Sequence, residues 1–156
     1  MRRKDREIVE IEKIEAVIAE ADCCHLGFYD GGEVYIVPLS FGYQRDGGQS
    51  VFYFHSAKEG RKIDLIKTSP RVGFELDTHY KINTGETACA YSARFRSIIG
   101  TGTVTMIDSP DEKEKALHAL MLHTTRKDGW IFTDQMAAAV GVFKLEVEKM
   151  SCKEHL

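Results

Sequence analysis

The sequence predicts a mainly β protein in which six or seven short strands, mostly antiparallel, close into a small β-barrel with flanking helices. Its β-prone runs are separated by tight turns such as Asp30-Gly31-Gly32 and Asp46-Gly47-Gly48. Such turns join antiparallel neighbours and leave no room for the crossover helices of a βαβ fold. The length of 156 residues suits one domain with a full core, and no linker or internal repeat interrupts it. We therefore expect a single domain over residues 1–156.

The first half of the chain is expected to supply a helix, three strands and a second helix. Apolar residues at helical spacing predict an amphipathic helix over residues 5–21. Pro38 lies inside an otherwise regular strand, which indicates an edge, a bulge or a place where another group meets the backbone. The predicted elements are strands over 23–29, 34–43 and 51–54 and a helix ending at about Lys67.

The second half begins where Ser69-Pro70 ends that helix. Ser109-Pro110-Asp111-Glu112 has the pattern of a capping box with proline at the first helical position, and it predicts a helix to about His123. The remaining expectations are strands over 71–76, 91–107 and 140–147, a bulge or bend at Gly100 and Gly102, and loops over 77–88 and 124–135.

Composition excludes several classes of protein. The net charge of −3 offers no general attraction to nucleic acid or an anionic membrane, and the basic N-terminal residues are balanced by glutamates. The charged, amphipathic start is not typical of a signal peptide or a membrane span. The four cysteines lack the spacing of a zinc or redox motif. We therefore expect free thiols and a cytoplasmic location.

Residues 51–66 contain the most informative pattern. A strand ending at Phe54 passes through hydroxyl-bearing and basic residues, with Gly60 before the next helix. The first N–H groups of a helix lack internal partners and favour an anion, and Lys58, Arg61 and Lys62 would add charge-assisted hydrogen bonds. The segment is either a phosphate clamp, most simply for a flavin nucleotide, or a solvated basic turn.

Other residues are weaker candidates for chemistry. Cys23, Cys24 and His25 are consecutive, so a strand cannot aim all three at one metal ion. His118 and His123 are five residues apart, which places them off a common helix face. We therefore expect no metal site. Trp130 could equally stack on a ligand or fill the edge of the core.

Three ordered segments resemble the flavin proteins that are similar to pyridoxamine-phosphate oxidase, and the nitroimidazole-resistance branch in particular. The segments are residues 37–43, 52–64 and 94–102, and the start at residues 1–8 is also similar to that branch. The resemblance covers nearly the whole chain. It implies a split β-barrel that binds FMN at the interface of a homodimer.

The resemblance also implies roles for individual residues. Val37, Pro38, Leu39 and Ser40 would run along the flavin ring and meet its polar edge through their backbone. The phosphate end would be held by His55, Ser56, Ala57, Lys58 and Lys62, with Arg94 and Ser97 on a second strand at the phosphate side. Glu59 departs from the pattern, because relatives often have a basic residue there. Its carboxylate would have to turn away from the phosphate.

The implied function is that of a small FMN-dependent oxidoreductase acting on a nitro-aromatic compound or another small acceptor. His55 is the candidate catalytic residue, since an imidazole beside the flavin can donate a proton near neutral pH. Its alternative role is a hydrogen bond to the cofactor or backbone. Two other functions stay open: a flavin store or sensor without turnover, and a haem protein with His55, His79 or His155 as axial ligand.

Overall fold

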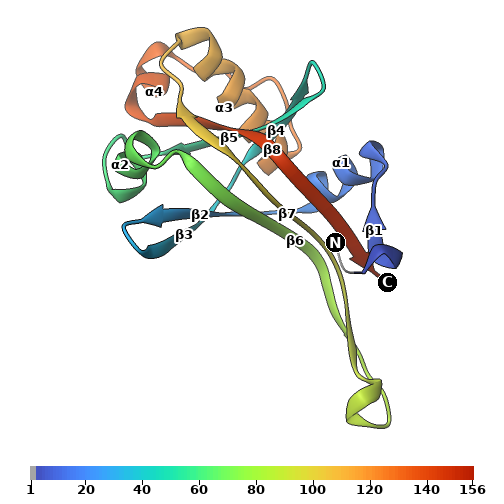
Figure 1. The fold of residues 1–156 in the computed structure, drawn as a ribbon. Coiled ribbons are helices and arrows are strands. Elements are labelled where there is room, and N and C mark those ends of the chain that lie inside the picture. The colour runs from blue at the N-terminus through green and yellow to red at the C-terminus, as the bar shows by residue number, and fades with distance from the viewer. Residues whose placement is uncertain (1–2) are drawn as a thin grey trace.

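The computed structural model describes residues 3–156, and their eight strands form one antiparallel sheet (Figure 1). The strand order is β3-β2-β6-β7-β8-β5-β4, with β1 paired to β8. The strands are β1 (Glu7–Ile8), β2 (Cys24–Asp30), β3 (Glu33–Leu39), β4 (Gly42–Asp46), β5 (Gln49–Ser56), β6 (Arg71–Asn83), β7 (Ser92–Met106) and β8 (Gly141–His155). The terminal strands β3 and β4 follow each other in the chain but do not pair, so the barrel is split and the sheet is not closed.

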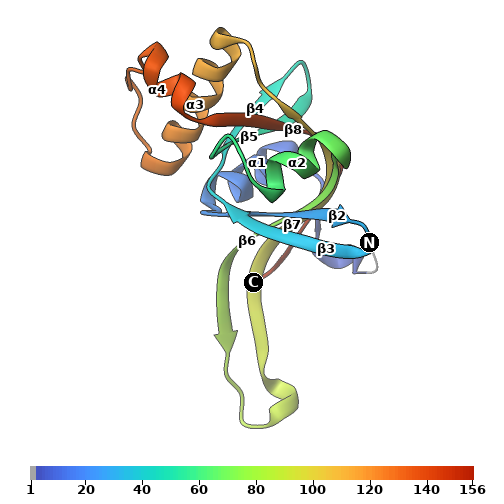
Figure 2. The same ribbon diagram turned by 90° about the vertical axis from the view of Figure 1, so that its left-hand side faces the viewer.

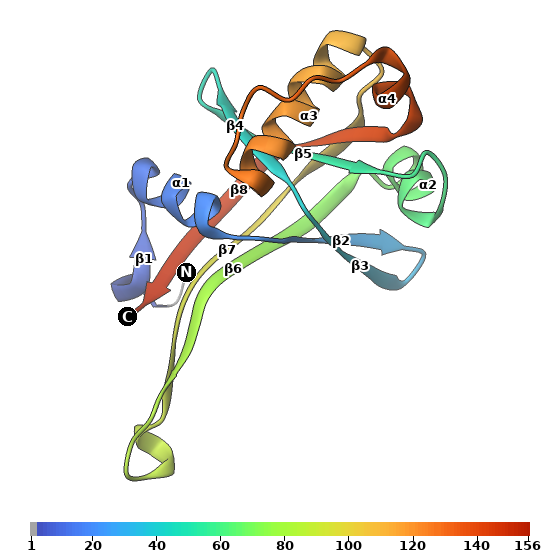
Figure 3. The ribbon, with the colours of Figure 1, turned by 180° about the vertical axis from the view of Figure 1, so that it is seen from behind.

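Four α-helices and two 3₁₀ turns accompany this sheet in the described part of the chain. They are α1 (Ile11–Glu20), α2 (Arg61–Thr68), α3 (Pro110–Thr125), α4 (Asp134–Ala139), η1 (Lys4–Arg6) and η2 (Ala88–Ala90). Figure 3 shows α3 and α4 on the side of β4, β5 and β8, with α2 just past the end of β5. None of the helices within residues 3–156 is long and apolar enough to cross a membrane.

Strand β5 contributes to two separate cores. Phe52 and Phe54 point into the barrel, where they pack with residues of β2, β6, β8, α1 and α2. Val51 and Tyr53 point to the other side and pack beneath α3. Because both faces of the strand are covered, its sequence is a continuous apolar run rather than an alternating one.

The N-terminal helix is shorter than residues 5–21. It begins at Ile11, and Ile8 belongs instead to β1, opposite Cys152 of β8. The burial of Ile8 in the barrel core explains why this residue is in a strand and not in the helix, because tertiary packing outweighs a weak helical preference. The prediction for the opening residues extends to Met1 and Arg2, which lie outside the described part.

The predicted loop over residues 77–88 was wrong for residues 77–83. Strand β6 continues to Asn83 and forms with β7 a long arm that leaves the body of the barrel, as Figures 1 and 2 show. The register shifts between Thr78 and Lys81, and His79 adopts a φ of 59° there. Glu20 of α1 pairs with His79 at 3.1 Å and with Arg96 at 2.8 Å. These tertiary contacts fasten the base of the arm.

Three other boundaries also differ from the sequence prediction. The strand expected over 34–43 is two strands, and the chain breaks at Ser40 and Phe41 rather than at Pro38. Helix α4 begins at the end of the predicted loop over 124–135 and extends past it. The Thr133 side chain caps this helix by accepting a hydrogen bond from Met136 N. Strand β8 runs eight residues past the predicted end, because β7 and β1 pair with its second half.

The glycine at the start of β4 is required by a close approach. A Cβ on Gly42 would lie 2.4 Å from Leu120 N of α3, so only glycine lets the strand meet the helix backbone. The predicted bulge near Gly100 and Gly102 is confirmed by a register shift between Thr101 and Gly102. Pro110 opens α3 as predicted, but the Ser109 side chain makes no capping hydrogen bond.

Candidate functional site

Two segments with predicted site residues run beside each other. Gly42 lies opposite Tyr53 in the β4–β5 pair, and this register places Ser40 and His55 at the same end of the two strands. At the other end, Arg61 Nε donates to Asp30 Oδ2 at 2.7 Å, which ties the start of α2 to the β2–β3 hairpin. Strand β3 and residues 55–61 therefore flank one candidate site along its length.

The start of α2 has the features of an anion site. Gly60 has a φ of 119°, a conformation that side chains disfavour, and its carbonyl accepts from the N–H groups of Ile63 and Asp64. No side chain of residues 3–156 caps this helix. The N–H groups of Arg61 and Lys62, which precede Ile63 in the first turn, therefore remain available to an anion.

Lys62 strengthens this interpretation. Its ammonium group is half-buried and forms no ion pair with any side chain of residues 3–156. Burial lowers the pKa of Lys62, because no carboxylate offsets the cost of desolvating the charge. A phosphate at the start of α2 would remove this penalty. Lys58 and Glu59 are exposed just before the helix, so the Glu59 carboxylate is free to face solvent.

Arg61 has a different role from Lys62. Besides Asp30, its guanidinium contacts Glu33 at 3.5 Å and lies 4.6 Å from the centre of the Tyr35 ring. These contacts use its charge to hold the β2–β3 hairpin against α2. Arg61 was predicted to add a hydrogen bond to the phosphate, whereas within this chain it is a structural cation.

The predicted ring-binding residues lie on an edge strand. Val37 and Leu39 point inward and pack against the barrel core, while Pro38 and Ser40 are exposed. Within the described part of the chain β3 pairs with β2 alone, so its other edge offers unpaired backbone groups. The prediction that Pro38 marks an edge is confirmed, since a proline there costs no ladder hydrogen bond.

His55 borders an apolar pocket. Its side chain points away from the barrel interior, on the same side of β5 as Tyr53, and the cavity there has a volume of about 230 Å³. The other lining residues are Leu117, Leu120, Met121, Phe132, Met136 and Val140. This pocket was not predicted, because no helix was predicted over the residues of α4. The Thr133-to-Met136 capping pattern was the available signal.

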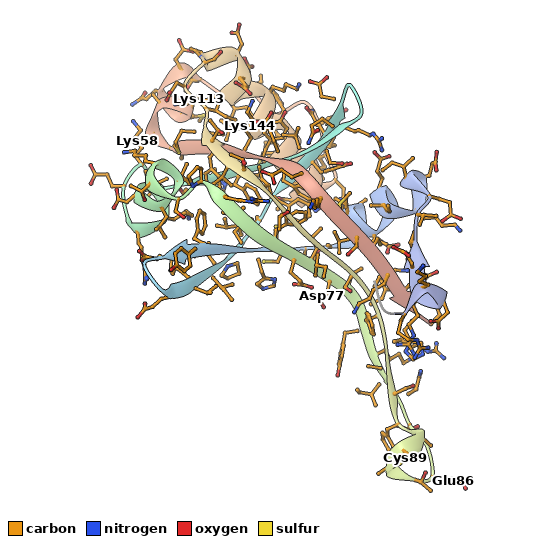
Figure 4. The ribbon with its side chains drawn as sticks, in the orientation of Figure 1. Lys58, Asp77, Glu86, Cys89, Lys113 and Lys144 are labelled. Atoms are coloured by element: carbon orange, nitrogen blue, oxygen red, sulfur yellow. The ribbon has the colours of Figure 1, made fainter. Side chains whose placement is uncertain are left out.

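Arg94 and Ser97 are not brought to this site within one chain. Met106 of β7 lies opposite Phe143 of β8, and the adjacent Val142 lies opposite His55, so that end of β7 is near the site. Ser97 and Arg94 are nine and twelve residues away along the strand, which is about 30 and 40 Å. Figure 4 shows Lys58 beside α2 and, far from it, Cys89 at the tip of the arm formed by β6 and β7.

Several other candidates are structural. All four cysteines are free thiols, and burial raises the pKa of Cys152 to about 11 and that of Cys24 still further. No metal-binding cluster exists within residues 3–156. Trp130 Nε1 donates to Thr125 Oγ1 and to the Lys127 carbonyl, so its polar edge closes the loop after α3. A cavity of about 360 Å³ between α3 and α4 carries four carboxylates and is unsuited to a phosphate.

Comparison with known proteins identifies the family of this chain. Residues 10–154 match the family described as pyridoxamine 5'-phosphate oxidase. The chain belongs to this family. No curated protein gives a significant match. Membership accounts for the split antiparallel sheet and for the order of the three motif segments.

Several solved structures have a similar fold. A candidate 5-nitroimidazole antibiotic resistance protein from Bacteroides thetaiotaomicron is 34% identical, with a TM-score of 0.81 over 95% of this chain and 86% of that one. A flavocytochrome from Azotobacter vinelandii is 18% identical, with a TM-score of 0.80 over 100% and 72% of the two chains. An FAD-binding and haem-binding protein from Mycobacterium smegmatis is 15% identical, with a TM-score of 0.77 over 96% and 73%. The last two similarities concern the fold alone.

Proposed function

We propose that this member of the pyridoxamine 5'-phosphate oxidase family binds FMN and uses it to reduce a small acceptor such as a nitro-aromatic compound. The observation that carries the proposal is the half-buried Lys62 at the start of α2, where no side chain of residues 3–156 provides a counter-charge or a cap. The 34% identity to the Bacteroides protein supports the same function. The chain's own residues fit the cofactor, because a phosphate would satisfy both Lys62 and the first-turn N–H groups.

The remaining parts of the site fit the rest of FMN. The free edge of β3 would offer backbone donors and acceptors to the polar edge of the ring near Pro38 and Ser40. The flavin supplies the electron transfer when it is bound. The protein would fix the ring and exclude water from one side of it.

His55 would supply protons to the substrate. Reduction of a nitro group consumes protons together with electrons, and His55 faces an apolar pocket suited to a flat, poorly charged acceptor. Phe132 and Met136 would contact the acceptor from α4 and the loop before it. The pocket thus favours turnover over a flavin store, which would need no second binding space.

A homodimer would complete the site. Arg94 and Ser97 match family positions at the phosphate side, yet they lie far from the clamp of their own chain. A second copy could bring them to it. We therefore expect sedimentation equilibrium to give a dimer. A monomer that binds FMN tightly would contradict this part of the proposal.

Ligand titration of the purified apoprotein is the direct test. The fluorescence of FMN should fall when FMN binds, which gives its dissociation constant. Riboflavin, which lacks the phosphate, should bind at least about tenfold more weakly. Equal affinities would contradict the phosphate clamp. Haem is the second candidate, and a Soret band on adding haemin would favour it. However, His79 pairs with Glu20, and His155 Nδ1 lies 2.7 Å from the Ala93 carbonyl oxygen, so both rings are already engaged.

A further inference from the structure

The outer face of the sheet carries an imidazole beside the predicted ring-binding segment. His25 of β2 lies directly opposite Pro38 of β3 on one side and Glu75 of β6 on the other. Directly opposed residues of antiparallel strands point to the same face. That face is the outer one, because the adjacent Leu26 and Leu76 belong to the barrel core. His25 therefore stands outside the barrel, one strand, or about 5 Å, from the edge strand β3.

The two ring nitrogens of His25 have different surroundings. Nδ1 is buried, lies 3.2 Å from Glu75 Oε2 and makes no hydrogen bond of regular geometry within residues 3–156. The side chain as a whole is 41% exposed, so its open edge is the one that carries Nε2. The next pair along the two strands is Gly27 and Gly73, whose lack of side chains leaves that edge accessible. Glu75 thus holds the ring from the inside, and Nε2 is free to meet a ligand.

The carboxylates beside His25 favour a proton on this cluster. Burial raises the pKa of Glu75, and the carboxylate of Asp77, two residues further along the same face, raises it again. Neither carboxylate pairs with a lysine or arginine of residues 3–156. Lys153 of β8 is two strands away from Asp77 and lies over the Phe95 ring. The other side chains around the pair bring no positive charge, namely Cys23, Pro38, Ser97 and Ile99. A proton shared by His25 and Glu75 relieves the repulsion between the two carboxylates.

A proton held at this place has a use in the proposed function, where the polar edge of the flavin ring meets β3 near Pro38. Two electrons and one proton, which a hydride donor supplies together, leave that edge with a negative charge, and a positive charge nearby favours this state. His25 offers such a charge from the strand next to Pro38. His55 does not, because it faces the apolar pocket on the other side of β5.

We propose that the His25–Glu75 pair faces the polar edge of the bound flavin and stabilises its reduced form with a proton that the two side chains hold. The inference rests on the proposed function, since it takes FMN as the cofactor and β3 as the ring-binding strand. His25 contacts the ring, and Glu75 is a positioning residue that acts through His25. The pair sets how readily the bound flavin accepts electrons, whereas Lys62 sets how tightly the phosphate is bound.

The test compares the affinities for oxidised and reduced FMN. His25→Gln keeps a side chain that can hydrogen-bond and removes the ring that carries the proton. The dissociation constant for oxidised FMN, from fluorescence titration, should change by less than about threefold. Potentiometric titration of the bound FMN with dithionite and a reference dye then gives the affinity for the reduced form. That dissociation constant should rise at least about tenfold, which corresponds to a midpoint potential about 30 mV lower for a two-electron couple.

Two further variants make the comparison specific. His118→Gln removes an imidazole of similar exposure that pairs with Glu114 on α3, and it should change neither dissociation constant. Glu75→Gln should weaken the binding of reduced FMN in the same direction as His25→Gln, and it does not depend on the His25 variant folding. Combined with His25→Gln it should add little, because the two side chains act as one unit. Fully additive effects would show that Glu75 does not act through His25 and would overturn the pair.

The outcomes separate this inference from the proposed function. If the wild type binds FMN with the expected dependence on Lys62 but His25→Gln leaves the midpoint potential unchanged, the inference is wrong and the proposed function stands. Equal losses of affinity for both forms of FMN would also overturn it, because His25 would then be an ordinary contact of the ring. If the wild type binds no FMN, the proposed function fails and this inference fails with it.

Discussion

Replacing Lys62 with methionine is the sharpest perturbation of the candidate site. Methionine keeps the apolar stem that packs at the start of α2 and removes only the charge. A hydrogen bond to a charged group contributes about 1.5–3 kcal/mol, so the FMN dissociation constant should rise about 10- to 150-fold. The affinity for riboflavin should hardly change, because riboflavin has no phosphate.

The apoprotein offers a second readout. Burial lowers the pKa of Lys62, which means that the folded chain holds its charge at a cost. Lys62→Met should therefore leave the free energy of unfolding of the apoprotein unchanged or raise it, as measured by urea denaturation. Lys67→Met, at the exposed end of the same helix, is the matched control and should not affect either quantity. Equal FMN affinities in wild type and Lys62→Met, by fluorescence titration, would refute the phosphate clamp.

Three further outcomes can be checked. His55→Ala should lower the rate of flavin reoxidation by a nitro-aromatic acceptor about 10²-fold with FMN still bound. His55→Gln should restore little of that rate, because an amide does not transfer the proton. Equal single-turnover rates in all three proteins would show that His55 is only a structural contact. Gly42→Ala should destabilise the protein by about 1–3 kcal/mol in urea unfolding, because the added Cβ would lie 2.4 Å from Leu120 N. An unchanged midpoint of the urea transition would show that α3 can move away. Burial lowers the pKa of His123 below 6.5, so the unfolded chain binds more protons as the pH falls from 7 to 5 and stability falls with it. His123→Gln should reduce that pH dependence, and an identical slope in both proteins would contradict the assignment.

The amino-acid sequence was sufficient to predict the local elements that depend on neighbouring residues. The turns at Gly31 and Gly47, the helix start after Gly60 and the stop at Pro70 follow from backbone preferences that act over a few residues. The same is true of the uncapped start of α2, since its free N–H groups belong to one short segment. The family resemblance was also visible, because its three motifs lie in order along the chain.

Only the tertiary structure decided the features that join distant segments. Residues 77–83 are polar and read as a loop, but pairing with β7 and the ion pairs of Glu20 make them a strand. Arg61 is a structural cation because the fold brings Asp30 to it. Gly27 and Gly73 meet because β2 and β6 are neighbours in the sheet, 46 residues apart in sequence. Local preference cannot encode such pairs, since the free energy that selects them comes from contacts formed only when the whole sheet has assembled.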